Sequence, residues 1–348
     1  MSAQTTSPTA YEGDRTFTWF TPVRRKPSEY ELYTVGQQSA PGHWLDVGWP
    51  VHYDNGDPPW SDASSAVRTT LWAQYRDPSR TWQRPYVSTS NQDEQALGRL
   101  LPVLVKVSAT TLSPTWSKEI LGRTYAAWPF VEYGLFRALA YAVREARADT
   151  IEFATVFQAV DRLRLLQDVV LHLDLLQEEL PGFTDADARE AWMSDPSLVP
   201  VREVVEHLAV STDWVEILLV TALVFEPVVG RLAKVELFSH RAPSFGDGVT
   251  PVVMAQSIAD ADRAVSAAQA LVRLVVSDPE HGAANAALIR GWFDSWQPRC
   301  EKAARALAGA FTCCRDGQGG DEQEGTDDAL ARVLAFQRDA VAGCGLPA

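Results

Sequence analysis

Two stretches of the chain repeat one pattern, and this repeat constrains the fold more than any other feature. An Asp and an Arg stand three residues apart in both stretches, at Asp161/Arg164 and again at Asp260/Arg263. Residues three apart share one face of an α-helix, so each pair can act as a unit. The repeat therefore predicts that the chain contains two copies of the same helical element.

A lone glutamate precedes each of these frames. Glu132 lies 30 residues before Arg162, and Glu226 lies 35 residues before Ala261. Apolar residues at three-and-four spacing place each glutamate and its frame in a pair of long helices. We therefore predict two duplicated helical hairpins and an all-α fold. That fold is a ferritin-like helical bundle with a long, irregular, aromatic-rich N-terminal arm.

The two frames match the carboxylate di-iron motif D-E-x-R-H without its metal ligands. In ferritin-like di-iron bundles, two helices each give one Glu and two others each give a Glu and a His. Here the Glu positions hold Arg162 and Ala261, and the His positions hold Leu165 and Ala264. Only the two upstream glutamates remain, and two carboxylates beside an arginine make a poor iron site. We therefore expect no metal in this chain.

The remaining glutamates need another source of positive charge. A carboxylate inside a bundle is costly unless it is paired, and Arg162 could supply the missing charge. We predict that Arg162 lies within ion-pair distance of Glu132 or Glu226. Pro227 follows Glu226 directly and has no backbone N–H, which predicts a kink at that point.

The Asp–Arg frames suggest a structural role. In a working di-iron site such groups orient the histidine ligands. Without those histidines, we expect Asp161, Arg164, Asp260 and Arg263 to form a buried polar network that joins the two hairpins. Ordinary surface ion pairs are the alternative.

Composition divides the chain into three parts. We predict an extended, interface-forming arm over residues 1–90, a metal-free bundle over 91–312, and an acidic loop with a short C-terminal helix over 313–348. Eight of the twelve tryptophans precede residue 130, and such rings must bury against the bundle or against another chain. Because aromatic residues often anchor interfaces, we expect a partner for part of the arm. The candidate interface residues are Trp19, Phe20, Trp44, Trp49 and Trp60.

The periodicity and the turn signals also give helix boundaries. Thr150 and Thr250 are predicted helix caps, as is Ser211 or Asp213, and residues 315–328 are predicted to be a solvated loop. The predicted helices span 92–107, 116–147, 151–180, 185–193, 201–210, a segment from about 212 that includes Glu226, 250–278, 283–311 and 329–341.

Charge and composition exclude several functions. The net charge of −14 argues against nucleic-acid binding, and no apolar run is long enough to cross a membrane. Residues 1–13 do not resemble a secretory signal, so we expect a cytoplasmic protein. His172, four residues after Asp168, and His207, four residues after Glu203, are each expected on a helix surface. Reduced thiols are expected at Cys300, Cys313, Cys314 and Cys344.

Over most of residues 14–280 the chain resembles a known family. It is similar to the small (β) hydroxylase subunit of soluble bacterial di-iron multicomponent monooxygenases, which oxidise methane, propane, alkenes, phenol and toluene. The order and spacing of the matching stretches make the signal fairly specific. These stretches are Thr16–Pro22, Tyr75–Pro78 with Tyr86-Val87, Glu132–Gly134 and Asp161–Gln167.

The resemblance implies a non-catalytic subunit that stabilises a large, iron-bearing α subunit in an αβ or α₂β₂ hydroxylase. It also implies a coupling protein, an iron–sulfur flavin reductase and NADH- and O₂-dependent oxidation, with alkene or alkane as the expected substrate. The missing ligands fit β and not α. A self-standing ferritin-like iron protein and a helical scaffold for an unrelated partner are the alternatives.

Overall fold

The computed structural model describes residues 20, 22–24, 26–37, 62–312 and 322–346. These residues form helices and connecting segments without a β-strand, which confirms the all-α class for the described part of the chain. The helices are α1 (Glu29–Thr34), α3 (Gln83–Ser108), α4 (Ala126–Glu145), α5 (Asp149–Glu179), α6 (Ala188–Ser194), α7 (Val199–Val210), α8 (Trp214–Val220), α9 (Thr250–Val276), α10 (Gly282–Leu307) and α11 (Glu322–Ala342).

Three stretches continue these helices as π-helix, and shorter 3₁₀ turns connect the rest. The π-helical stretches are η3 (Trp116–Tyr125), η4 (Thr221–Gly230) and η5 (Leu232–Arg241). Glu226 and Pro227 both lie in η4, so the regular α-helix is interrupted where the sequence predicts a kink. The 3₁₀ turns are η1 (Asp62–Ser64), η2 (Trp72–Gln74), η6 (Ala242–Phe245) and η7 (Ala308–Thr312).

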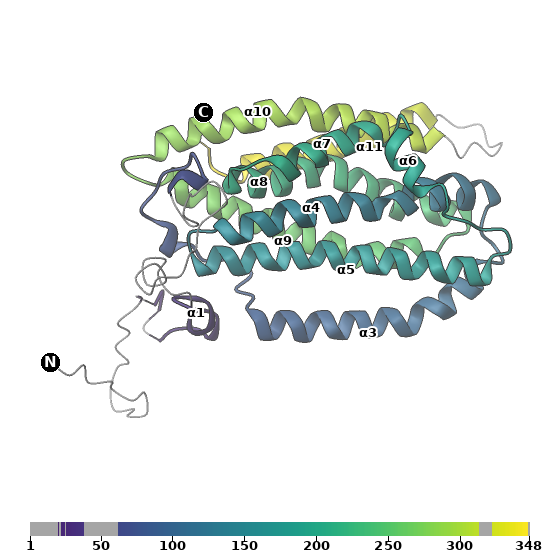
Figure 1. Ribbon diagram of the computed structural model, residues 1–348, viewed down its shortest axis with the longest axis horizontal. Helices are drawn as coiled ribbons and strands as arrows, with labels where there is room; N and C mark the ends of the chain where they lie inside the picture. Colours follow the sequence, from purple (N-terminus) through teal and green to yellow (C-terminus); the bar gives the residue numbers. More distant parts are fainter. Residues whose placement is uncertain (1–19, 21, 25, 38–61, 313–321, 347–348) are drawn as a thin grey trace.

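The duplicated hairpins form the centre of the molecule. One hairpin is η3–α4 followed by α5, and the other is α8–η4–η5 followed by α9. α4 lies along α5, and α5 lies along α9 (Figure 1). α3 runs along the outer side of α5, whereas α7, α10 and α11 cover the opposite side. The largest fully buried side chains, such as Trp116, Trp128 and Trp214, fill the space between these helices.

The described part of the predicted arm packs on the bundle itself. The ring of Trp72 lies 5.2 Å from that of Trp214, and the Tyr75 hydroxyl donates to the Ala267 carbonyl at 3.0 Å. Phe20 is half-buried. The other four candidate interface residues, Trp19, Trp44, Trp49 and Trp60, lie outside the described residues.

Several predicted boundaries are wrong. α3 begins at Gln83 and not at residue 92, so the division drawn at residue 90 falls inside this helix. The start was missed because few of the first residues of α3 are buried, so the sequence there shows little apolar periodicity. Pro85 does not end the helix, because proline is tolerated in a first helical turn. α11 begins at Glu322, so residues 322–328 are helical and the C-terminal helix is longer than predicted. Glu and Gln favour helix, which outweighs the acidic, glycine-containing composition used to predict a loop.

The predicted caps have mixed outcomes. The Asp213 carboxylate caps α8 by accepting hydrogen bonds from the backbone N–H groups of Val215 and Glu216. Thr150 is not a cap, because α5 begins one residue before it. At α9, Thr250 is already helical, and the Asp247 carboxylate accepts its N–H at 3.0 Å in the capping role. None of the helices in the described ranges is long and apolar enough to cross a membrane.

Candidate functional site: the metal-ligand positions of the bundle

Four buried charged residues meet at the centre of the bundle, and three of them are positions that the sequence analysis matched to a di-iron motif. Glu132 comes from α4, Arg162 from α5, Glu226 from η4 and Lys234 from η5, and we call these four residues the central charge cluster. The Arg162 guanidinium lies 2.6 Å from the Glu226 carboxylate and 3.2 Å from that of Glu132, as the sequence predicts. The Lys234 ammonium also pairs with Glu226 and lies 3.9 Å from Glu132. Two cations therefore balance two carboxylates.

Burial makes this balance necessary. None of the four side chains is more than 8% exposed. Burial by itself would raise the pKa of the Glu226 carboxyl, but the adjacent Arg162 and Lys234 lower it to about 2. Burial opposes the charge of Arg162 too, yet Glu226 and Glu132 raise its pKa above the ordinary value. The ion pairs therefore outweigh burial and favour the charged forms of Glu226 and Arg162.

Two neighbours fix the positions of the carboxylates. The Trp128 indole N–H donates to Glu132 Oε1 at 2.8 Å from one turn earlier on α4. Gly230 follows Glu226 by four residues, and a Cβ atom there would lie 2.6 Å from the Glu226 carboxyl carbon. The Glu226 side chain therefore occupies the space that any residue larger than glycine would need.

The other positions that the sequence analysis matched to the di-iron motif lie around the same cluster. Leu165, Ala261 and Ala264 line a cavity of about 10 Å³ together with Glu132, Arg162 and Lys234, and Glu226 lines an adjoining one with Ala261. Such a volume holds about one water molecule. These residues do not fit a di-iron centre, because they supply two carboxylates and two cations where iron needs further oxygen and imidazole ligands. Within the described ranges, no three His, Cys, Asp or Glu residues are arranged to hold a metal.

Lys234 is the member of the cluster that the sequence analysis missed. It follows Glu226 by eight residues, which is roughly two helical turns. An i+8 partner on one helix face was the available signal. The extra residues of the π-helical turns between them obscure that spacing.

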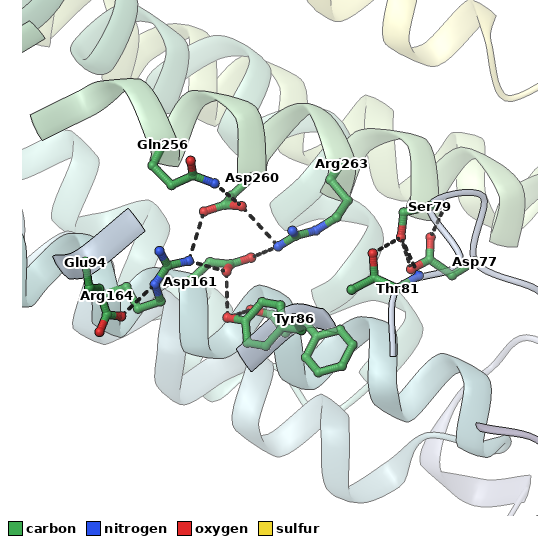
Figure 2. A network of polar contacts seen from close by, with 11 residues as sticks. Asp77, Ser79, Thr81, Tyr86, Glu94, Asp161, Arg164, Gln256, Asp260 and Arg263 are labelled. Atoms are coloured by element: carbon green, nitrogen blue, oxygen red, sulfur yellow. Dashed lines mark hydrogen bonds and ion pairs between the residues drawn. The ribbon is translucent and has the colours of Figure 1, made fainter. Parts of the chain in front are cut away.

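A second polar network joins the two hairpins, and we call it the hairpin network. It consists of Asp161 and Arg164 on α5 with Asp260 and Arg263 on α9 (Figure 2). Arg263 pairs with Asp161 and lies 3.2 Å from Asp260, and Arg164 lies 3.6 Å from Asp161 and 3.7 Å from Asp260. The two aspartates and Arg164 are buried, and Arg263 is partly exposed.

Helix α3 is tied to this network by two residues that were not predicted to join it. The Tyr86 hydroxyl donates to Asp161 at 2.7 Å, and Arg164 Nε donates to Glu94 at 3.0 Å (Figure 2). Burial, and then repulsion by Asp161, raises the pKa of Asp260 to about 6. The network thus connects three helices, and within it the Asp260 carboxyl has a pKa above its ordinary value.

His172 does not lie on the helix surface where we expected it. It is 1% exposed, and its Nδ1 lies 2.9 Å from the buried Tyr125 hydroxyl. Burial lowers the pKa of this imidazole to about 4, so it is neutral at neutral pH. Cys300 and Cys344 are buried free thiols, whereas Cys313 and Cys314 lie outside the described residues.

Comparisons with known proteins agree with this arrangement. A family model described as methane/phenol/alkene hydroxylase matches residues 49–279. The chain is 31% identical over 297 residues to the "Propane 2-monooxygenase, hydroxylase component small subunit" of Rhodococcus jostii (strain RHA1), covering 84% of this chain and 80% of the relative. It is 30% identical over 314 residues to the "Methane monooxygenase component A beta chain" of Methylosinus trichosporium, covering 87% and 79%.

Solved structures share the fold. A structure of toluene 4-monooxygenase with toluene bound superposes with a TM-score of 0.72 at 22% identity, covering 86% of this chain and 99% of that one. A xenon-pressurised phenol hydroxylase from Pseudomonas sp. OX1 gives a TM-score of 0.78 at 18% identity, covering 97% and 98%. At these identities the likeness establishes the helical architecture alone.

Proposed function

This chain belongs to the methane, phenol and alkene hydroxylase family, and we propose that it is the small, non-catalytic subunit of a di-iron hydroxylase. The observation that carries this proposal is the central charge cluster. Arg162 and Lys234 supply positive charge beside the two glutamates that the sequence analysis matched to di-iron ligands. The proposed role is to stabilise a large subunit that bears the iron.

Within that role, the charged side chains of this chain stabilise the centre of the bundle by pairing with one another. The central charge cluster links the two hairpins, and the hairpin network ties α3 and α9 to α5. In the complete enzyme, the di-iron centre of the large subunit would supply the activation of O₂. This chain would present a rigid helical surface to that subunit.

The proposed reaction inserts one oxygen atom into a small hydrocarbon at the expense of NADH and O₂. An alkane or alkene is the proposed substrate, because relatives named for propane and methane are 29–31% identical, whereas those named for toluene and phenol are 23–24% identical. An iron–sulfur flavin reductase and a coupling protein would complete the system. Because the reaction consumes NADH, we propose the cytoplasm as its compartment.

The test is to express this chain alone and together with the large hydroxylase subunit of the same source, and to measure iron and hydrocarbon oxidation in both preparations. We expect no bound iron and no activity for the chain alone, and both in a stable complex. Stoichiometric iron in the chain alone would instead indicate a ferritin-like iron protein. Failure to form any complex would favour the alternative that the chain is a helical scaffold for an unrelated partner.

A further inference from the structure

Helix α3 is covered by the rest of the described structure on one side only. It contacts α5 through a narrow stripe that includes the fully buried Leu101 and Val105. In Figure 1 it runs along the edge of the molecule, and the other labelled helices except α1 lie on the far side of α5. Most of its surface therefore faces outward.

That outward surface carries a second apolar stripe. Leu100 is 53% exposed, Val103 63% and Val107 65%, and the small residue Ala96 precedes them at the same helical angle. The spacing of four, three and four residues places all of them on one line along the helix, the pattern by which helices pack against each other. Leu104 is half-buried against the core and lies between this line and the buried stripe. The apolar face of α3 is thus wider than α5 covers.

Basic residues flank the exposed stripe. Arg99 and Lys106 are both exposed, and neither forms an ion pair with the described residues. The sequence contains no acidic residue from Gln95 to Lys118, although the chain as a whole has a net charge of −14. This part of α3 is therefore a locally basic surface on an acidic protein.

We propose that the outer α3 face, formed by Ala96, Leu100, Val103 and Val107 with Arg99 and Lys106, docks an amphipathic helix of the large hydroxylase subunit. The occupant would place its own apolar stripe on these side chains and Asp or Glu residues beside the two basic ones. The inference rests on the proposed function, which supplies the partner.

Charge argues against a second copy of this chain as the occupant. If two α3 helices packed antiparallel with Leu100 against Val103, Arg99 of one copy would lie beside Lys106 of the other. A parallel pair would leave both basic residues without an acidic partner, because neither copy has an Asp or Glu on this part of α3. Like charges across a helix pair repel, whereas an acidic partner helix is attracted.

The test compares full-length variants for binding to the purified large subunit, with far-UV circular dichroism and thermal melting as checks on folding. The double variant Val103→Glu/Val107→Glu should weaken binding at least tenfold without loss of helix, because both side chains are already exposed. Arg99→Glu/Lys106→Glu should weaken binding most at low salt, where electrostatic attraction is least screened. The matched control is Val210→Glu, which places the same charge at a 75% exposed valine on α7.

Each outcome decides a different question. Wild-type affinity in both double variants would overturn the docking assignment while leaving the proposed function intact. A wild-type chain that does not bind the large subunit would overturn both. If the wild-type chain alone sediments as a dimer and Val103→Glu/Val107→Glu as a monomer, the face joins two copies and the proposal is wrong.

Discussion

Replacing Arg162 with methionine tests the central charge cluster directly. The substitution keeps a long side chain but removes the guanidinium that lies 2.6 Å from Glu226 and 3.2 Å from Glu132. Lys234 is then the only cation for two buried carboxylates, so the cluster changes from neutral to a net charge of −1. Removing one partner from a buried ion pair costs about 3–5 kcal/mol, a large share of the roughly 5–15 kcal/mol that stabilises a typical domain.

The assay is urea unfolding followed by far-UV circular dichroism, with the free energy of unfolding obtained by linear extrapolation. We expect Arg162→Met to lower that free energy by about 3–5 kcal/mol and the melting temperature by on the order of 10 °C. Adding Glu226→Gln to the same chain should recover part of the loss, because Lys234 and Glu132 then balance each other.

A surface ion pair provides the matched control. Lys302 lies 3.2 Å from Glu203 with both side chains well exposed, so Lys302→Met should change stability by less than about 1 kcal/mol. If Arg162→Met unfolds at the wild-type urea concentration, or if the Glu226→Gln addition makes it less stable still, charge balance does not hold this site together.

Three further predictions follow from the same packing. The folded-state pKa of Glu226 is about 2, below its ordinary value of 4.5. The stabilisation from its charged form is therefore complete above pH 4.5 and is lost as the pH falls toward 2. Between pH 5 and 3, the free energy of unfolding should fall less steeply in Glu226→Gln than in the wild type. Gly230→Ala should destabilise by about 1–3 kcal/mol through overlap with Glu226, whereas Gly98→Ala, with nothing near its Cβ, should stabilise by about 0.5–1 kcal/mol, and the opposite order in urea unfolding would refute this. Tyr86→Phe removes the buried donor to Asp161 and should cost about 1–3 kcal/mol in the same assay, and a neutral result would mean that the hydroxyl does not tie α3 to α5.

The sequence predicted the centre of the fold well because apolar residues recur every three or four positions along long helices. The two hairpins and the Asp–Arg frames follow from spacing along long helices, and the pairing of Arg162 with Glu132 or Glu226 follows from the need to balance a buried carboxylate. The hypothesis that Asp161 and Asp260 are buried across the hairpins agrees with their exposures of 7% and 6%. Whether these positions descend from a metal site stays a prediction.

Two of the misses arise where the local pattern is weak or irregular, and a third arises where the deciding contact comes from another segment. Lys234 is separated from Glu226 by π-helical turns, so its position depends on backbone geometry that the spacing rule does not contain. The start of α3 was missed because a helix packed on one narrow stripe carries a weak apolar signal. His172 was misplaced because a neighbour four residues away suggested solvent, whereas its partner, Tyr125, comes from another segment.

The sharing of two carboxylates by Arg162 and Lys234 also means that no single substitution turns this site into an iron site. Iron binding here would require replacing both cations with ligands and introducing ligand side chains at Leu165, Ala261 and Ala264. Changing Arg162 to glutamate first would place three carboxylates beside one lysine, and changing Lys234 first would leave two beside one arginine. Each first substitution therefore unbalances the buried charge and still leaves the ligand set for iron incomplete.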